Sequence, residues 1–428
     1  MTSLSDDVFG ALDATAPAGP IGVAVSGGGD SMALMLLADE WTRSRGRALF
    51  VATVDHGLRP ESADEASMVA EAAQALGRPV ETLRWTGWDG RGNVQAAARA
   101  ARRDLLSAWA ARNGLAAVAL GHTMDDQAET VLMRLGRGAG VDGLSGMAMR
   151  SEANGTVWLR PMLGVRRDAL REALRARNAA WVDDPSNDDP KYDRVRARAA
   201  LETLADLGVT AEGLAETASR LSEARAALDE GATALFRDAA EWGLCGELRL
   251  KLAPLRAAPD ELTRRLFRAV LTRAAGAEYG PRADAEAAAL TAMLGLRLGG
   301  GRSLHGCVIR PDGPAGAVIT REASAVRVDF AEDRLWDGRF AVSVQGGENA
   351  SVGPLGAAGD RILADLIDSG ALAAPRGWTA APKGARIATP ALWRGEELAA
   401  APLAGFGAGM TARFAAADAT FDAAMSRG

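Results

Sequence analysis

The chain has 428 residues, of which 48% are hydrophobic and 24% charged, and its formal net charge is −6. This length exceeds one ordinary hydrophobic core, so two or three domains are expected. No apolar run reaches the length of a membrane span, and the acidic N-terminus lacks the basic residues of a secretory signal. Only two cysteines are present, which excludes a disulfide framework and a zinc cluster. A cytoplasmic protein is predicted, and the negative charge argues against generic nucleic-acid binding while leaving a local basic face open.

The most informative stretch is a glycine-rich turn, Ser26–Ser31, between a predicted buried strand (21–25) and a predicted helix whose apolar spacing begins at Met32. Such a turn lets the backbone approach an anion, and the first N–H groups of the helix donate to that anion. The carboxylate of Asp30 could in addition hold a magnesium ion. The turn therefore predicts a phosphate site, and its candidate residues are Ser26, Gly27, Gly28, Gly29, Asp30 and Ser31.

The type of phosphate loop follows from what the turn lacks. A Walker loop requires a lysine, but the chain has only Lys191, Lys251 and Lys383, and the turn does not match the dinucleotide pattern G-x-G-x-x-G. The turn instead resembles the SGGxDS loop of the ATP-pyrophosphatase (PP-loop) family, whose members cleave ATP to AMP and pyrophosphate while adenylating a carbonyl oxygen. The resemblance implies that the turn binds ATP with Mg²⁺ on Asp30. A glycine-rich turn without a ligand is the alternative.

Strands and helices alternate along the first half of the chain. The apolar runs and helical periods predict the strands 49–54, 79–83 and 117–120 and the helices 64–77, 93–113 and 124–135. This alternation predicts an α/β fold with a doubly wound parallel sheet, in which ligands bind at the carboxyl ends of the strands. The turn at Ser26 lies at such an end, as do the pairs Asp55-His56 and Gly121-His122. We therefore assign Asp55, His56, Gly121 and His122 to the ATP site.

Two arginines on the helix 93–113 are further candidates for the ATP site. Arg99 and Arg102 are three residues apart, so they share one helical face. They could form a solvated basic surface, or they could neutralise a triphosphate, a task that P-loop enzymes give to lysine. The spacing alone does not decide between these interpretations.

A second polar cluster opens the predicted helix 124–135. Thr123 is a candidate N-cap, and Asp126 and Glu129 are three residues apart, so both carboxylates lie on one helical face. Acidic residues in a first helical turn can simply offset the helix dipole. Together with His122, however, they form a cluster that suits a cationic substrate, a metal ion or a general base.

The order of these motifs resembles that of the tRNA(Ile)-lysidine synthetases. The matching stretches are SGGGDS, VDHGLRPES, NVQAAARAARR, GHTMDDQAETVLMRLGRGAGVDGLSGM and RPM, followed by WVDDPSND and YDRVRAR. Val195 departs from the family pattern, which usually has asparagine at that position. The charged segment 160–198 could be a solvated loop, but the resemblance favours an RNA-binding edge with Asn187, Arg194 and Arg198 as tRNA contacts.

The second half of the chain has a different pattern of predicted secondary structure. Helical spacing covers 211–240 and 260–295, whereas short strands are predicted at 307–310, 317–320, 326–330 and 339–344, before a helix at 360–370. We therefore divide the chain into a PP-loop catalytic domain (1–205), a helical domain (206–300) and a small mixed α/β C-terminal domain (301–428). The resemblance implies that the second and third domains bind tRNA.

The resemblance implies one reaction. ATP adenylates the wobble cytidine of the CAU anticodon of tRNA(Ile), and free lysine then displaces AMP to form lysidine. Asp126 and Glu129 would bind lysine and remove its proton, because lysine arrives as a cation. The alternatives are another PP-loop adenylating enzyme, such as a tRNA thiolase or an amidotransferase, and an inactive RNA-binding relative. The resemblance leaves a homodimer open, and no membrane contact is expected.

Overall fold

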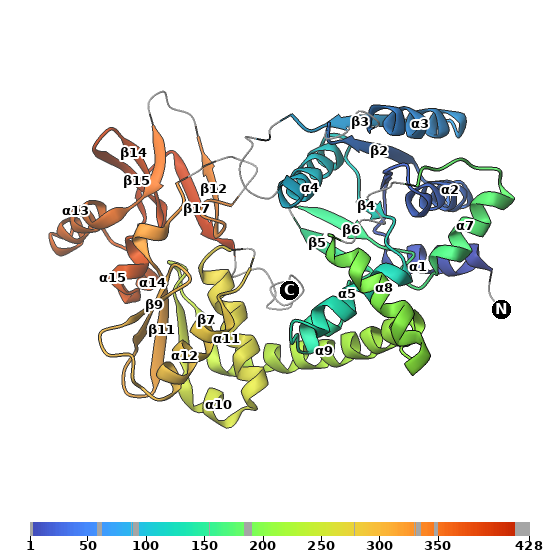
Figure 1. Cartoon of the computed structure of the whole chain (residues 1–428). Coiled ribbons are helices and arrows are strands. Elements are labelled where there is room, and N and C mark those ends of the chain that lie inside the picture. The colour runs from blue at the N-terminus through green and yellow to red at the C-terminus, as the bar shows by residue number, and fades with distance from the viewer. Residues whose placement is uncertain are drawn as a thin grey trace. The chain divides into compact units, whose positions relative to one another are not determined.

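The computed structural model describes residues 3–57, 62–86, 88, 94–153, 155–183, 191–277, 279–328, 330, 335–345 and 350–415. The chain divides into two compact units, Met1–Arg225 and Ala226–Gly428, which are coloured blue to green and green to red in Figure 1. The three domains with boundaries near residues 205 and 300 remain a proposal. No helix in the described residues combines the length and the apolar character that crossing a lipid bilayer requires.

A six-stranded sheet forms the centre of the first unit (Figure 1). Its strands lie in the order β3-β2-β1-β4-β6-β5, and all neighbours are parallel except the edge pair β5 and β6. The strands are β1 (Ile21–Ala24), β2 (Leu49–Asp55), β3 (Val80–Arg84), β4 (Ala117–Leu120), β5 (Arg150–Ala153) and β6 (Thr156–Leu159). This arrangement confirms the predicted α/β fold with a parallel sheet.

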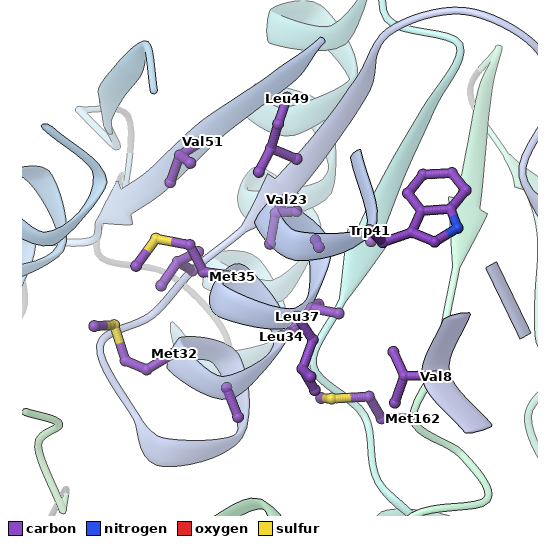
Figure 2. Packing of buried hydrophobic residues seen from close by; sticks show 14 of the residues in the cluster. Val8, Val23, Met32, Leu34, Met35, Leu37, Trp41, Leu49, Val51 and Met162 are labelled. Carbon is purple, nitrogen blue, oxygen red and sulfur yellow. The ribbon is translucent and has the colours of Figure 1, made fainter. Parts of the chain in front are cut away.

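Helices cover both faces of this sheet. The helices of the first unit are α1 (Leu4–Thr15), α2 (Gly29–Ser44), α3 (Ser62–Ala75), α4 (Val94–Arg112), α5 (Met124–Leu135), α6 (Val141–Leu144), α7 (Arg167–Ala176) and α8 (Asp193–Leu204), of which α6 and α8 pack against α5. On one face, α1, α2, α3 and α7 bury apolar side chains with Val23, Leu49 and Val51 of the strands, and Figure 2 shows the part that α2 takes in this packing. On the other face, α4 packs through Trp109. Successive residues of a strand point to opposite faces, so Gly22 faces α4.

Substituting Gly22 with alanine should destabilise the first unit by about 1–3 kcal/mol, because the new methyl group overpacks the core. A Cβ atom at Gly22 would lie 2.6 Å from two ring carbons of Trp109 and 2.8 Å from Leu115. Chemical denaturation would measure the loss. Gly10→Ala is the matched control, because nothing lies within 4 Å of a Cβ there and alanine favours a helix. Equal stability of the two variants would contradict the packing described here.

The second unit is a mixed α/β structure, the class predicted for residues 301–428, but its first strands lie at 240–251, within the stretch that was predicted to be helical. The long helix α9 (Ala211–Ala239) enters it, and its described sheets have the strand orders β7-β8-β11-β10-β9, β12-β17 and β13-β14-β15-β16. The strands are β7 (Ala240–Trp242), β8 (Leu248–Lys251), β9 (Arg302–Leu304), β10 (Cys307–Pro311), β11 (Gly316–Arg321), β12 (Phe340–Val344), β13 (Ser351–Pro354), β14 (Pro390–Arg394), β15 (Glu397–Ala401), β16 (Phe406–Gly407) and β17 (Met410–Phe414). The helices are α10 (Leu252–Ala257), α11 (Asp260–Ala274), α12 (Ala283–Leu294), α13 (Gly356–Asp368), α14 (Arg376–Ala380) and α15 (Lys383–Arg386).

The helical spacing predicted over 260–295 corresponds to two helices, α11 and α12, which are separated where Gly276 has φ +57° and Pro281 cannot donate a helical hydrogen bond. One predicted strand of the second unit is wrong. The strand predicted at 326–330 is absent from the described residues of that range. The backbone N–H of Arg327 donates instead to the carboxylate of Asp337 at 2.9 Å, so a side chain takes the place of a neighbouring strand.

Candidate active site

The predicted phosphate turn joins β1 to α2 and is held in shape by its own hydroxyl groups. The Oγ of Ser31 donates to the carbonyl of Gly28 at 2.9 Å and accepts from the backbone N–H of Ser26 at 3.0 Å. Gly27 has φ +87°, a left-handed conformation that glycine adopts without strain. Gly28 is the N-cap of the 16-residue helix α2 and has no side chain to accept from its first N–H groups. These donors and the helix dipole favour an anion at the turn.

Two other segments border the phosphate turn. A Cβ atom on Gly121, just after β4, would lie 3.0 Å from the Cα and 3.1 Å from the N of Ser31, so glycine permits this close approach of two backbones. The backbone N–H of Val182 donates to the carbonyl of Gly27 at 3.0 Å. The structure therefore brings the two predicted stretches, Ser26–Ser31 and Gly121-His122, together.

Three carboxylates, one from the phosphate turn and two from α5, meet around one arginine, Arg167, which was not among the predicted site residues. Its Nε lies 3.0 Å from Oδ2 of Asp30, while its Nη atoms lie 3.4 Å from Oδ1 of Asp126 and 3.8 Å from Oε1 of Glu129. The backbone N–H of Arg167 also donates to Oδ2 of Asp125 at 2.8 Å, which ties the start of α7 to the start of α5. One guanidinium thus connects the phosphate turn with the acidic turn of α5.

Two arginines of α8 complete this carboxylate cluster. The Nε of Arg198 lies 3.0 Å from Oε1 of Glu129, and Nη1 of Arg194 lies 3.8 Å from Oδ1 of Asp126. Both arginines were predicted to contact tRNA, and that role remains a prediction beside these ion pairs. Asn187, the third predicted tRNA contact, lies outside the described residues.

The carboxylates of the cluster differ in proton affinity. Burial raises the pKa of Asp30 and of Glu129 by more than the neighbouring arginines lower it. Burial also acts on Asp126, but the charge of Arg167 and a hydrogen bond from the backbone of Thr123 lower its pKa overall. The Oε2 of Glu129 is buried and has no hydrogen-bond partner within the described part of the chain. Asp126 therefore has the properties of a fixed anion, whereas Glu129 has those of a general base.

Excess positive charge gathers beside the cluster. Burial lowers the pKa of Arg99, Arg102 and Arg160, and a neighbouring arginine lowers each further: Arg194 acts on Arg99, and Arg99 acts on the other two. No carboxylate among the described residues offsets the charge of Arg99 or Arg102. Guanidinium groups in this situation favour a polyanionic ligand, which supports the triphosphate interpretation over a solvated surface. Arg160 is a further candidate that the site prediction missed.

Asp55 and His56, which lie at and just after the end of β2, make local structural contacts. Oδ1 of Asp55 accepts from the backbone N–H of Gly57 at 2.9 Å and from the hydroxyl of Ser62 at 2.7 Å, and these bonds lower its pKa. His56 packs edge-on against Trp85 with ring centroids 6.1 Å apart, and burial followed by the charge of Arg102 lowers its pKa. Asp55 therefore closes the turn after β2, while a contact of either residue with ATP remains a prediction.

Binding of a magnesium ion at this site would require ligands from the substrate as well as from the protein. Among the described residues, no three His, Cys, Asp or Glu side chains gather into a metal site. Mg²⁺, however, is usually held by one or two carboxylates together with substrate phosphates and water. The half-buried carboxylate of Asp30, at the mouth of an anion-binding turn, fits that donor set.

His122 should titrate with a pKa near 4. Burial lowers the pKa of His122 to about 4, against the opposing charge of Asp126 and with help from Arg160. The unfolded chain binds this proton near pH 6.5, so the contribution of His122 to stability is complete above that pH and is lost as the pH falls toward 4. NMR titration of the imidazole measures the pKa, and His122→Asn should flatten the pH dependence of unfolding in this window. An imidazole that titrates near 6.5 would contradict the burial described here.

Comparison with known proteins gives close relatives. A family model described as the PP-loop domain matches residues 5–204. A tRNA(Ile)-lysidine synthase from Ruegeria pomeroyi is 45% identical over 407 residues, which cover 95% of this chain and 93% of that protein. Proteins of the same name from Wolbachia pipientis wMel and Anaplasma marginale are 34% and 35% identical to this chain. Each alignment covers 78% of this chain, and the alignments cover 78% and 73% of the two relatives, respectively.

Proposed function

The chain belongs to the tRNA(Ile)-lysidine synthase family, and we propose that it attaches lysine to the wobble cytidine of tRNA(Ile) with a CAU anticodon. The observation that carries this proposal is the Arg167 contact, which places the acidic pair Asp126 and Glu129 directly beside Asp30 of the phosphate turn. A site that adenylates a base and then delivers a cationic nucleophile to it needs these two parts side by side. We place the reaction in the cytoplasm.

In the first step of the proposed reaction, O2 of the cytidine attacks the α-phosphate of ATP and pyrophosphate leaves. The backbone N–H groups at the start of α2 would hold the phosphates, and Arg99 and Arg102 would stabilise the charge that develops on them. Gly121 lets the end of β4 lie against the phosphate turn, and His122, neutral at pH 7, would act as a hydrogen-bond partner of the nucleotide. Asp30 would hold Mg²⁺, which neutralises phosphate charge when bound.

In the second step, the side-chain amine of lysine attacks C2 of the adenylated base and AMP leaves with the oxygen. Lysine arrives as an ammonium ion, so it must lose a proton before it can attack. Asp126 would bind the cation as the fixed anion, and Oε2 of Glu129, which lacks a hydrogen-bond partner among the described residues, would accept the proton. Asn187, Arg194 and Arg198 would contact the tRNA, together with the domains 206–300 and 301–428.

The alternatives fit the chain less well. A thiolase of this fold would use a reactive cysteine, but both Cys245 and Cys307 are buried in the second unit. Burial raises the pKa of Cys245, and it raises the pKa of Cys307 to about 12, so neither thiol forms a thiolate readily. An inactive RNA-binding relative would not require the carboxylate cluster.

Incorporation of radiolabelled lysine tests the proposal. We would incubate the protein with ATP, magnesium and two CAU-anticodon transcripts, those of isoleucine tRNA and of elongator methionine tRNA. Label in the isoleucine transcript alone is the expected result. Release of pyrophosphate on another substrate without any label would keep the adenylating chemistry and overturn lysidine formation.

A further inference from the structure

Three residues that follow α7 lie against the phosphate turn and have no part in the reaction steps above. They are Trp181, Val182 and Asp183, and we call them the strap. The backbone N–H of Val182 donates to the carbonyl of Gly27 at 3.0 Å, and Val182 pairs with Gly28 as in a parallel sheet. The turn therefore has a strand-like neighbour that comes from a distant part of the chain.

The hydrogen bond from Val182 fixes the peptide group between Gly27 and Gly28. The carbonyl and the N–H of a trans peptide point in opposite directions. Because the carbonyl of Gly27 points to the strap, the N–H of Gly28 points away from it. Glycine imposes few steric limits, so without this bond the peptide could rotate and turn its carbonyl oxygen toward a bound phosphate. A phosphate is stabilised by N–H groups, and a carbonyl oxygen repels it.

The indole ring of Trp181 lies on the first residue of α2. A Cβ atom on Gly29 would lie 3.4 Å from Cδ1 and 3.6 Å from Nε1 of this ring, which is ordinary contact distance. The half-buried ring also packs against the hydrophobic cluster to which Val25 and Met32 belong. These two residues directly precede and follow the turn. Trp181 thus anchors the strap both to the core of the first unit and to the start of α2.

The third residue of the strap contributes less to its position. Asp183 pairs with Nη2 of Arg171 on α7 at 2.9 Å, but the side chain of Asp183 is 68% exposed. Exposed ion pairs contribute little, because water and salt screen them. The position of the strap therefore depends mainly on the ring of Trp181 and on the backbone of Val182.

We propose that Trp181 is a positioning residue for ATP, which holds the strap on the phosphate turn and so keeps the N–H groups of the turn directed at the phosphates. Donors that are already oriented bind an anion more tightly, because binding requires no reorganisation. The carboxylates that we assign to lysine, Asp126 and Glu129, are held by Arg167 and by α8. Loss of Trp181 should therefore affect ATP more than lysine. This inference rests on the proposed function for the identity of the ligand at the turn.

Kinetics with each substrate, in the full chain with magnesium, test this role. Trp181→Leu keeps an apolar side chain against the core but removes the flat ring, so it should raise the KM for ATP by roughly tenfold and the KM for lysine by less than about twofold. Trp181→Phe should recover most of the loss. Asp183→Ala is the matched control within the strap and should behave like the wild-type protein. If folded Trp181→Leu shows equal changes in both KM values, or no change in either, Trp181 does not position ATP.

Tryptophan fluorescence provides a second measurement, which does not depend on lysine transfer. Titration with a non-hydrolysable ATP analogue should change the emission of the wild-type protein, because one indole ring lies on the occupied turn. Trp181→Phe should lose most of this change while calorimetry still detects binding of the analogue. Trp393→Phe removes a half-buried tryptophan of the second unit and should retain the change. A signal that survives unchanged in Trp181→Phe would contradict the proposal. Binding of the analogue as described, without lysine incorporation, would overturn the proposed function and leave this inference intact.

Discussion

Replacing Asp126 with asparagine should abolish lysine transfer, by about a hundredfold or more, while ATP binding stays nearly unchanged. Asp126 is held as an anion by Arg167 and by the backbone N–H of Thr123, which donates to its Oδ2 at 2.8 Å. Asparagine keeps an acceptor for Thr123, so the helix cap survives, but it removes the charge that we assign to lysine binding. Single-turnover lysine transfer and nucleotide titration would measure the two effects separately.

The neighbouring carboxylate provides the control for this experiment. Asp125 pairs with Arg166 at 3.3 Å and accepts from the backbone of Arg167, outside the carboxylate cluster. Asp125→Asn keeps that acceptor and should retain most lysine transfer. Loss of nucleotide binding in Asp126→Asn would contradict the role assigned to Asp126, as would equal losses of transfer in both variants.

Replacing Arg167 with alanine should raise the KM for lysine by roughly tenfold or more and reduce stability by about 3 kcal/mol, because three carboxylates then lose a shared cation. Its side chain is only 17% exposed, and Glu129 is 1% exposed, so water replaces little of the lost interaction. Without Arg167, repulsion between Asp30, Asp126 and Glu129 should also move the phosphate turn away from α5. Steady-state kinetics with each substrate and chemical denaturation would measure these effects.

Two further variants distinguish positioning of the cluster from a general loss of stability. Arg167→Lys keeps the charge but not the fork, so it should recover part of the stability and part of the affinity for lysine. Arg177 directly follows α7 and forms an exposed pair with Glu40. Arg177→Ala breaks this pair and should change stability by less than about 1 kcal/mol. An unchanged KM for lysine in folded Arg167→Ala would reduce Arg167 to a structural residue.

Local patterns in the sequence predicted the first unit well. Buried strands and helical periods gave β1, β2, β4 and α5 within one or two residues, since each pattern depends on neighbours along the chain. Thr123 was predicted as the N-cap for the same reason, and the structure adds that Thr123 and Asp126 form a capping box. The second unit was harder to predict, because there Asp337 binds backbone and side chains of residues up to 16 positions away.

The sequence by itself determined the phosphate turn, the parallel sheet that presents it and the acidic pair on α5. Those features follow from glycine geometry, hydrophobic period and helical spacing, which act over a few residues. Only the tertiary structure decided which arginines balance the charges of the site carboxylates. Arg167 meets Asp30 across 137 positions of the chain, and Arg198 meets Glu129 across 69. No local pattern encodes such a pair, because its energy depends on the distance between side chains and on their burial after the helices have packed.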